Sequence, residues 1–117
     1  MRIEPYLFFD GDCEAALTFY QQCLGGQLVD LRRFRGSPME DQLPAAWLDK
    51  VMHAKFEADG HRFMASDRTP GQPFGGHAGY SMAVNLPGDP VRGEHVFKAL
   101  ATGGMITMPF ATTFWGA

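Results

Sequence analysis

The chain has 117 residues, 45% of them hydrophobic, and a formal net charge of −3. This length supports one hydrophobic core but not two independent domains. The acidic balance gives no basic surface for a nucleic-acid partner, and no apolar run approaches the roughly 20 residues of a membrane span.

The two cysteines, Cys13 and Cys23, lie at opposite ends of one predicted helix. Ten helical residues separate them by roughly 15 Å, which is too far for a disulfide. The N-terminus leads straight into a predicted strand, without the basic and apolar leader of a signal peptide. We therefore expect reduced thiols and a cytoplasmic protein.

The first predicted elements are a strand over residues 5–9 and a helix over residues 13–24. Asp12 is a suitable N-cap, and Glu14 places negative charge in the first turn, where the helix dipole favours it. Gly25 can take the left-handed conformation that ends a helix.

A second strand is predicted over residues 27–34, followed by a long loop over residues 35–49. Residues 51–67 contain Asp59-Gly60 between two alternating runs, which predicts a hairpin with Ala58 opposite His61. One face of this hairpin is then apolar and should pack on a helix: Met52, Ala54, Phe56, Ala58, Phe63 and Ala65. The other face is mixed: His53, Lys55, Glu57, Arg62, Met64 and Ser66.

After a connector rich in Gly and Pro over residues 68–78, the strand–helix order repeats. A strand is predicted over residues 79–86, then a helix capped by Asp89 with Pro90 in its first position, then strands over 105–110 and 112–115. Two copies of one unit predict an α+β paired-module fold with a ligand cavity between or beside the halves.

Four segments carry a family resemblance: residues 5–12 (PYLFFDGD), 19–26 (FYQQCLGG), 50–54 (KVMHA) and 113–116 (TFWG). They resemble the PhnB-like branch of the vicinal oxygen chelate (glyoxalase/bleomycin-resistance/dioxygenase) superfamily. The resemblance implies cup-shaped βαβββ modules, usually in a homodimer, with module one at about 1–67 and module two at about 79–117. Members of the branch continue with two more strands, so we expect the second module to lack its final strands.

Metal-using relatives hold a divalent ion with inward-facing His and Glu side chains. The corresponding positions in this sequence are Pro5, Met64 and Tyr80, and the fourth lies beyond residue 117. Pro has no ligating side chain, and a thioether suits hard divalent ions poorly. The resemblance therefore implies the cup without the usual metal or another cofactor, and argues against glyoxalase I activity.

His53 is the strongest candidate for chemistry, because the predicted register places it opposite Ser66 and two residues from Lys55. An imidazole in a cavity can act as a general base near neutral pH. The alternative is a strand histidine bonded to Ser66 or water, since no carboxylate orients the ring within this register. Lys55 either fixes an anionic group of a substrate or pairs with Glu57 in solvent.

Three hypotheses for function stay open. The first is a metal-independent protein or enzyme that binds a small molecule; the second is a metal-dependent lyase or dioxygenase with non-standard ligands such as His53. The third is a binding module that sequesters a planar or antibiotic-like ligand between two subunits. A ubiquinone-pathway methyltransferase is disfavoured, because the Gly75-Gly76 segment precedes a strand and follows none, unlike a cofactor loop. The residues expected to line the cup are Leu7, Phe9, His53, Lys55, Met64, Ser66, Tyr80 and Trp115.

Overall fold

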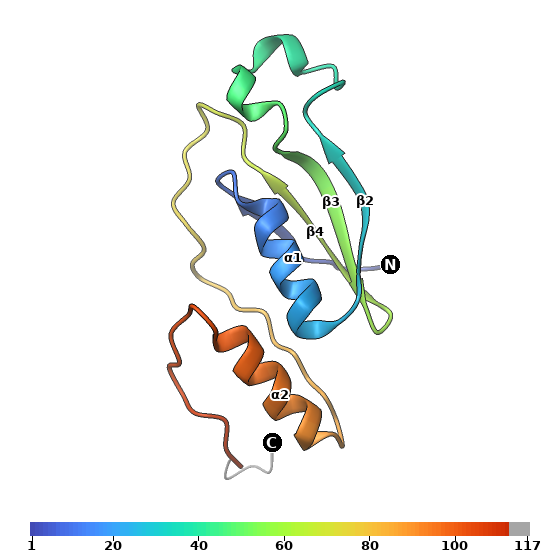
Figure 1. The fold of residues 1–117 in the computed structure, drawn as a ribbon, viewed down its shortest axis with the longest axis vertical. Helices are drawn as coiled ribbons and strands as arrows, with labels where there is room; N and C mark the ends of the chain where they lie inside the picture. The colour runs from blue at the N-terminus through green and yellow to red at the C-terminus, as the bar shows by residue number, and fades with distance from the viewer. Residues whose placement is uncertain (113–117) are drawn as a thin grey trace. The chain divides into compact units, whose positions relative to one another are not determined.

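The computed structural model describes residues 1–112, which fall into two compact units divided between Gly79 and Tyr80. The regular elements of the first unit are β1 (Tyr6–Phe9), α1 (Cys13–Leu24), β2 (Gln27–Arg33), the short 3-10 helices η1 (Glu40–Gln42) and η2 (Ala45–Trp47), β3 (Val51–Ala58) and β4 (His61–Asp67) (Figure 1).

The four strands form one mixed sheet in the order β1-β4-β3-β2. Strand β3 runs antiparallel to both neighbours, whereas β1 lies parallel to β4 at one edge. Helix α1 covers one face of this sheet, as Figure 1 shows. The core between them consists of Leu7, Phe9, Cys13, Leu17, Val51, Ala54, Phe56 and Ala65. The fold is therefore of the α+β class, as predicted.

The hairpin of β3 and β4 has the predicted register, with Ala58 opposite His61. Asp59 and Gly60 have φ of 51° and 79°, and two positive φ angles are what a type I′ turn requires. Ala54 and Phe56 are buried against α1, which confirms that the apolar face of the hairpin packs on the helix.

Strand β2 contains a β-bulge that the sequence did not reveal. Val29 lies opposite Lys55, but Arg32 lies opposite His53, so the pairing shifts by one residue between them. Within the bulge Asp30 has a φ of 55°, in the left-handed region. A bulge adds one unpaired residue to a strand and re-aims its side chain.

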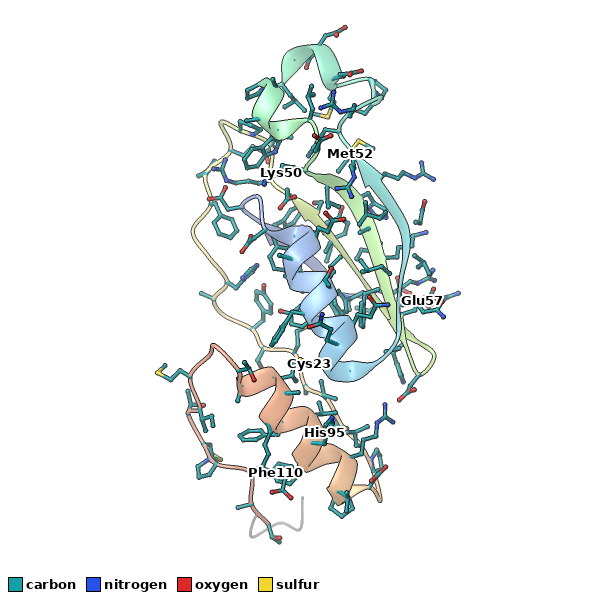
Figure 2. The ribbon with its side chains drawn as sticks, in the orientation of Figure 1. Cys23, Lys50, Met52, Glu57, His95 and Phe110 are labelled. Carbon is teal, nitrogen blue, oxygen red and sulfur yellow. The ribbon has the colours of Figure 1, made fainter. Side chains whose placement is uncertain are left out.

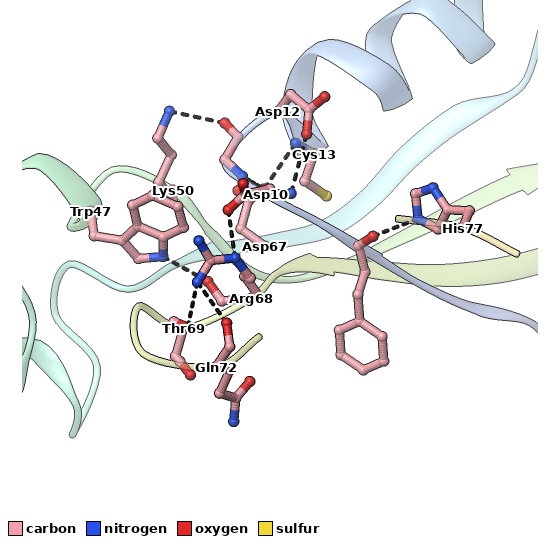
Figure 3. Close-up of polar contacts among 12 residues, drawn as sticks. Asp10, Asp12, Cys13, Trp47, Lys50, Asp67, Arg68, Thr69, Gln72 and His77 are labelled. Carbon is pink, nitrogen blue, oxygen red and sulfur yellow. Dashed lines mark hydrogen bonds and ion pairs between the residues drawn. The ribbon is translucent and has the colours of Figure 1, made fainter. Parts of the chain in front are cut away.

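The start of α1 is capped from a distance by Asp67, at the end of β4. This carboxylate is 3% exposed, and its Oδ1 accepts hydrogen bonds from the backbone N–H of Gly11 at 2.8 Å and of Cys13 at 3.0 Å (Figure 3). Its Oδ2 accepts from Val51 N–H at 2.9 Å. Asp12 occupies the N-cap position as predicted, but its side chain makes no capping bond.

The predicted loop over residues 35–49 contains η1 and η2 and is tied to the end of the sheet. Trp47 Nε1 donates to the carbonyl of Arg68 at 2.9 Å, and Lys50 Nζ donates to the carbonyl of Gly11 at 2.9 Å (Figure 3). Arg68 in turn forms an ion pair with Asp10. These contacts join three segments that are distant in sequence.

The second unit contains helix α2 (Pro90–Ala101), with Pro90 at its start as predicted. Asp89 Oδ1 accepts a hydrogen bond from Arg92 N–H at 3.1 Å, which confirms the predicted cap. None of the helices described over residues 1–112 has the length and apolar character needed to span a membrane.

The strands predicted over residues 79–86 and 105–110 are wrong: neither range is a strand. A strand needs a neighbour for its backbone N–H and C=O groups, and the described part of this unit contains no strand. The alternating apolar residues of the first range are exposed instead, with Tyr80 at 54%. The strand predicted over 112–115 lies outside the described residues, except for Thr112, which is not in a strand.

Candidate functional site

The sheet face of the first unit that α1 does not cover, here called the open face, carries an aromatic pair from β1. Tyr6 and Phe8 lie opposite Met64 and Ser66 of β4, and their side chains are 38% and 53% exposed. Their ring centroids are 5.0 Å apart. Large exposed aromatic side chains that sit together offer an apolar surface to a ligand.

Leu7 and Phe9, which the sequence analysis placed in the cup, lie on the other side of the sheet. They are 7% and 6% exposed and belong to the core under α1. All four residues of β1 are large and apolar, so the sequence contains no alternation that fixes which two point inward. Leu7 pairs with buried Ala65, and the side chains of paired residues lie on the same face of a sheet, so Leu7 faces the helix.

His53 extends from β3 on the open face and contacts Tyr6. Tyr6 Oη and His53 Nδ1 are 3.1 Å apart, and the ring centroids are 5.8 Å apart. If Nδ1–H donates to the phenol oxygen, Nε2 is a proton acceptor; if the phenol donates to Nδ1, Nε2 carries the proton. In both cases the hydrogen bond with Tyr6 occupies Nδ1 and determines whether Nε2 donates a hydrogen bond to a ligand or accepts one from it.

Two cations and a carboxylate lie beside His53. Asp30 Oδ1 is 3.0 Å from Arg32 Nε, and Asp30 Oδ2 is 3.7 Å from Lys55 Nζ. The hydrogen bond from Arg32 is the main cause that lowers the pKa of Asp30, and the charges of Arg32, Lys55 and His53 lower it further. The ion pairs hold Asp30 ionised between the two strands.

Asp30 is the residue that the sequence reasoning missed. A regular register has no carboxylate near His53, whereas the bulge in β2 accompanies an Asp30 carboxylate that lies against Lys55 and against Arg32, the residue opposite His53. Of the two alternatives for Lys55, the pairing with Glu57 is wrong, since Lys55 pairs with Asp30, whereas Glu57 lies 3.5 Å from Arg62. No sequence signal marks this bulge beyond the tolerance of Asp for positive φ.

The other candidate residues are spread more widely. Met64 is half-buried between Tyr6 and Lys55, while Ser66 is 5% exposed beside Phe8. Tyr80 belongs to the second unit, and Trp115 lies outside the described residues. Figure 2 shows Lys50 and Glu57 toward opposite ends of β3, the strand from which His53 and Lys55 extend between them.

The residues at the expected metal positions do not fit a divalent ion. Pro5 offers only its backbone carbonyl, which accepts a hydrogen bond from Met64 N–H at 3.0 Å. A thioether is a poor ligand for a hard cation. Over residues 1–112, no three His, Cys, Asp or Glu side chains are grouped closely enough to hold a metal ion.

Cys13 is not an activated nucleophile, although it opens α1. Burial is the largest cause that raises its pKa to about 12, and the nearby charges of Asp67, Asp12 and Glu14 add to it. The thiolate is the reactive form of cysteine, so this thiol is inert.

Comparison with known proteins defines the class. Residues 2–117 match the Glyoxalase/Bleomycin resistance protein/Dioxygenase superfamily, so the chain belongs to this superfamily. It is 33% identical over 125 residues to Protein YjdN of Escherichia coli (strain K12), with 98% of this chain and 82% of YjdN covered.

Two solved structures resemble the chain closely. Protein PA1353 from Pseudomonas aeruginosa is 41% identical, with a TM-score of 0.86 over 98% of this chain and 83% of that protein. A protein from Bacillus cereus, described as a putative 3-demethylubiquinone-9 3-methyltransferase, PhnB protein, is 25% identical, with a TM-score of 0.77 over 98% of this chain and 84% of that one. The predicted PhnB-like resemblance is confirmed.

Proposed function

We propose that the chain is a metal-independent protein that binds a small molecule on the open face, with His53 as the group that exchanges a proton with it. One observation carries this proposal: His53 is hydrogen-bonded through Nδ1 to Tyr6 at 3.1 Å on a sheet face that α1 leaves uncovered. Membership of the superfamily supports a ligand-binding role by analogy only, because one fold hosts many chemistries.

The surroundings of His53 suit recognition of a small molecule. Binding sites are mainly apolar, with a few polar groups that fix orientation. Here Tyr6 and Phe8 supply the apolar surface, while His53 and Lys55 supply the polar groups. The imidazole of His53 can give a proton to, or take one from, a ligand placed within hydrogen-bond reach of Nε2.

A fragment screen followed by amide NMR spectra tests this proposal. We expect binding fragments to shift the signals of Tyr6, Phe8, His53 and Lys55, and His53→Ala to weaken their affinity at least threefold. The matched control is His61→Ala, since His61 is exposed beside the hairpin turn and should leave affinity unchanged. Shifts confined to other regions, or equal affinity in the two variants, would contradict the proposal.

The competing hypothesis is a metal-dependent lyase or dioxygenase in which His53 is a ligand. Elemental analysis of the purified protein separates the two. We expect no stoichiometric Zn, Ni, Mn or Fe, because neither Pro5 nor Met64 has a side chain that supplies a hard ligand. One equivalent of any of these metals, lost in His53→Ala, would favour the metal-dependent reaction instead.

We further propose that the protein is cytoplasmic and forms a homodimer. The resemblance to the PhnB-like branch supports the dimer, and two unbridged, buried cysteines support a reducing compartment. Light scattering after size-exclusion chromatography should give twice the 12.9 kDa of one chain. A single-chain mass at micromolar concentration would contradict the dimer.

A further inference from the structure

The bulge in β2 holds a carboxylate in a costly backbone conformation. Asp30 has a φ of 55°, in the left-handed region that residues other than glycine adopt only at an energetic cost, which is smaller for Asp and Asn. In this conformation the Asp30 carboxylate lies between Arg32, on the same strand β2, and Lys55, on the neighbouring strand β3. The conformation thus presents a carboxylate to two cations on the open face.

The ion pairs of Asp30 can exchange partners, because all three side chains reach solvent. Asp30 is 37% exposed, Lys55 31% and Arg32 63%. Ion pairs at such exposure contribute little to stability. A second carboxylate arriving from solvent can therefore take over Arg32 and Lys55 at little cost to the fold.

The aromatic pair lies within reach of these cations. Lys55 is opposite Met64, and Met64 is opposite Tyr6, so two strand spacings, roughly 10 Å, separate Lys55 from Tyr6. His53, which contacts Tyr6, lies opposite Arg32 on the other side. Across the strands, the open face thus presents an aromatic surface, an imidazole and a pair of cations in sequence.

We propose that the open face binds an aromatic carboxylate, and that Asp30 occupies the place of the ligand's carboxylate when no ligand is bound. The ligand ring lies against Tyr6 and Phe8, and its carboxylate displaces Asp30 from Lys55 and Arg32. This inference rests on the proposed function, since it assigns a chemical class to the same site. Asp30 keeps the two cations in position and competes with weakly bound anions.

Benzoate and its neutral analogue benzamide test the inference, with affinities measured by amide NMR titration. We expect the wild-type protein to bind benzoate more tightly than benzamide, with shifts at Tyr6, Phe8 and Lys55. Asp30→Asn should tighten benzoate at least threefold and change benzamide less than twofold, because Asn tolerates the same positive φ but removes the competing charge. Lys55→Gln should weaken benzoate, whereas the matched control Lys98→Gln, on exposed α2, should not.

The outcomes separate this inference from the proposed function. Equal binding of the two probes on the open face would overturn the aromatic carboxylate and leave the binding function standing. Benzoate affinity that is unchanged or lower in Asp30→Asn would overturn the role of Asp30. If benzoate, benzamide and the screened fragments all leave the open face unshifted, both proposals fail.

Discussion

The two faces of the sheet in the first unit are built from the same four strands but differ in what they do. On the side of α1, Phe56 is 2% exposed, and the core around it is apolar. On the open face, Phe8 is 53% exposed, beside hydrogen-bonded and ionic pairs. One face therefore stabilises the fold, whereas the other can exchange its contacts, and substitutions on the two faces should have different effects.

Two phenylalanines on opposite faces should differ most in their contribution to stability. Phe56→Ala should lower the free energy of unfolding by about 3–5 kcal/mol, because it leaves a cavity beside Phe63, whose ring centroid is 5.2 Å away. Phe8→Ala should lower it by less than about 0.5 kcal/mol, since its ring is already half in water. Urea unfolding measures both, and equal losses would contradict the division between the faces.

The next effect concerns Asp67, which links the helix side to the sheet. Asp67→Asn should cost about 2–3 kcal/mol, because an amide NH₂ replaces one of the two oxygens that accept from Gly11, Cys13 and Val51. Thermal and urea unfolding should both report the loss. The control is Asp12→Asn, because the Asp12 side chain accepts a hydrogen bond only from Asp10 N–H, at 3.3 Å. A loss of stability in this variant as large as that in Asp67→Asn would show that Asp12 caps the helix.

Two adjacent glycines sharpen the contrast at the point where α1 turns into β2. Gly26 has a φ of 91°, and an added Cβ would lie 2.4 Å from the carbonyl oxygen of Glu57. Gly25 has a φ of 72° with nothing within 4 Å of that position. Gly25→Ala should cost about 1 kcal/mol of backbone strain, and Gly26→Ala about 2 kcal/mol, since it also pushes the turn away from β3. Equal losses in urea unfolding would show that β3 yields to the added methyl group.

The smallest effect is an ion pair that ties α1 to the edge strand β2. Glu14 Oε2 is 2.6 Å from Arg33 Nη2, and this hydrogen bond is the main cause that lowers the pKa of Glu14 from its ordinary value of 4.5. Between the lowered pKa and 4.5 the unfolded chain binds more protons than the folded chain, so the contribution is present above pH 4.5 and lost as the pH falls through the folded pKa.

Because both side chains are well exposed, Glu14→Gln should cost only about 0.5 kcal/mol at neutral pH. The difference from wild type should disappear in acid, which unfolding curves at several pH values would reveal. Introducing Arg33→Gln into both proteins serves as the control, and a pH-dependent difference that persists there would rule out the pair as its origin.

Local patterns in the sequence predicted the β3–β4 hairpin and the end of α1 well, but not that Leu7 and Phe9 face the helix. The Asp59-Gly60 turn and the alternation around it fixed the register of β3 and β4, and Gly25 ended α1 as expected. Two features escaped because they depend on contacts distant in sequence. The cap of α1 comes from Asp67, 54 residues after Cys13, and the bulge that holds Asp30 between Arg32 and Lys55 has no local signature.

In the second unit a local pattern predicted a strand that the structure does not contain. The alternation over residues 79–86 is typical of a strand. However, alternation predicts only which side chains would share a face, and it does not show whether a neighbouring strand is present for pairing. Helix α2 was predicted correctly because its stabilising signals, Asp89 and Pro90, are local. The family resemblance places Tyr80 among the site residues at the start of the second module, where the described residues form no strand.

The position of Asp67 has a consequence for how the first unit folds. Its carboxylate meets Gly11 and Cys13 only after β4 has docked beside β1, which closes a loop of more than 50 residues. The first turn of α1 therefore gains its cap only once the long-range parallel pairing exists, so helix and sheet consolidate cooperatively. A fragment that stops at the hairpin turn would keep the sequence of α1 but lose the group that anchors its beginning.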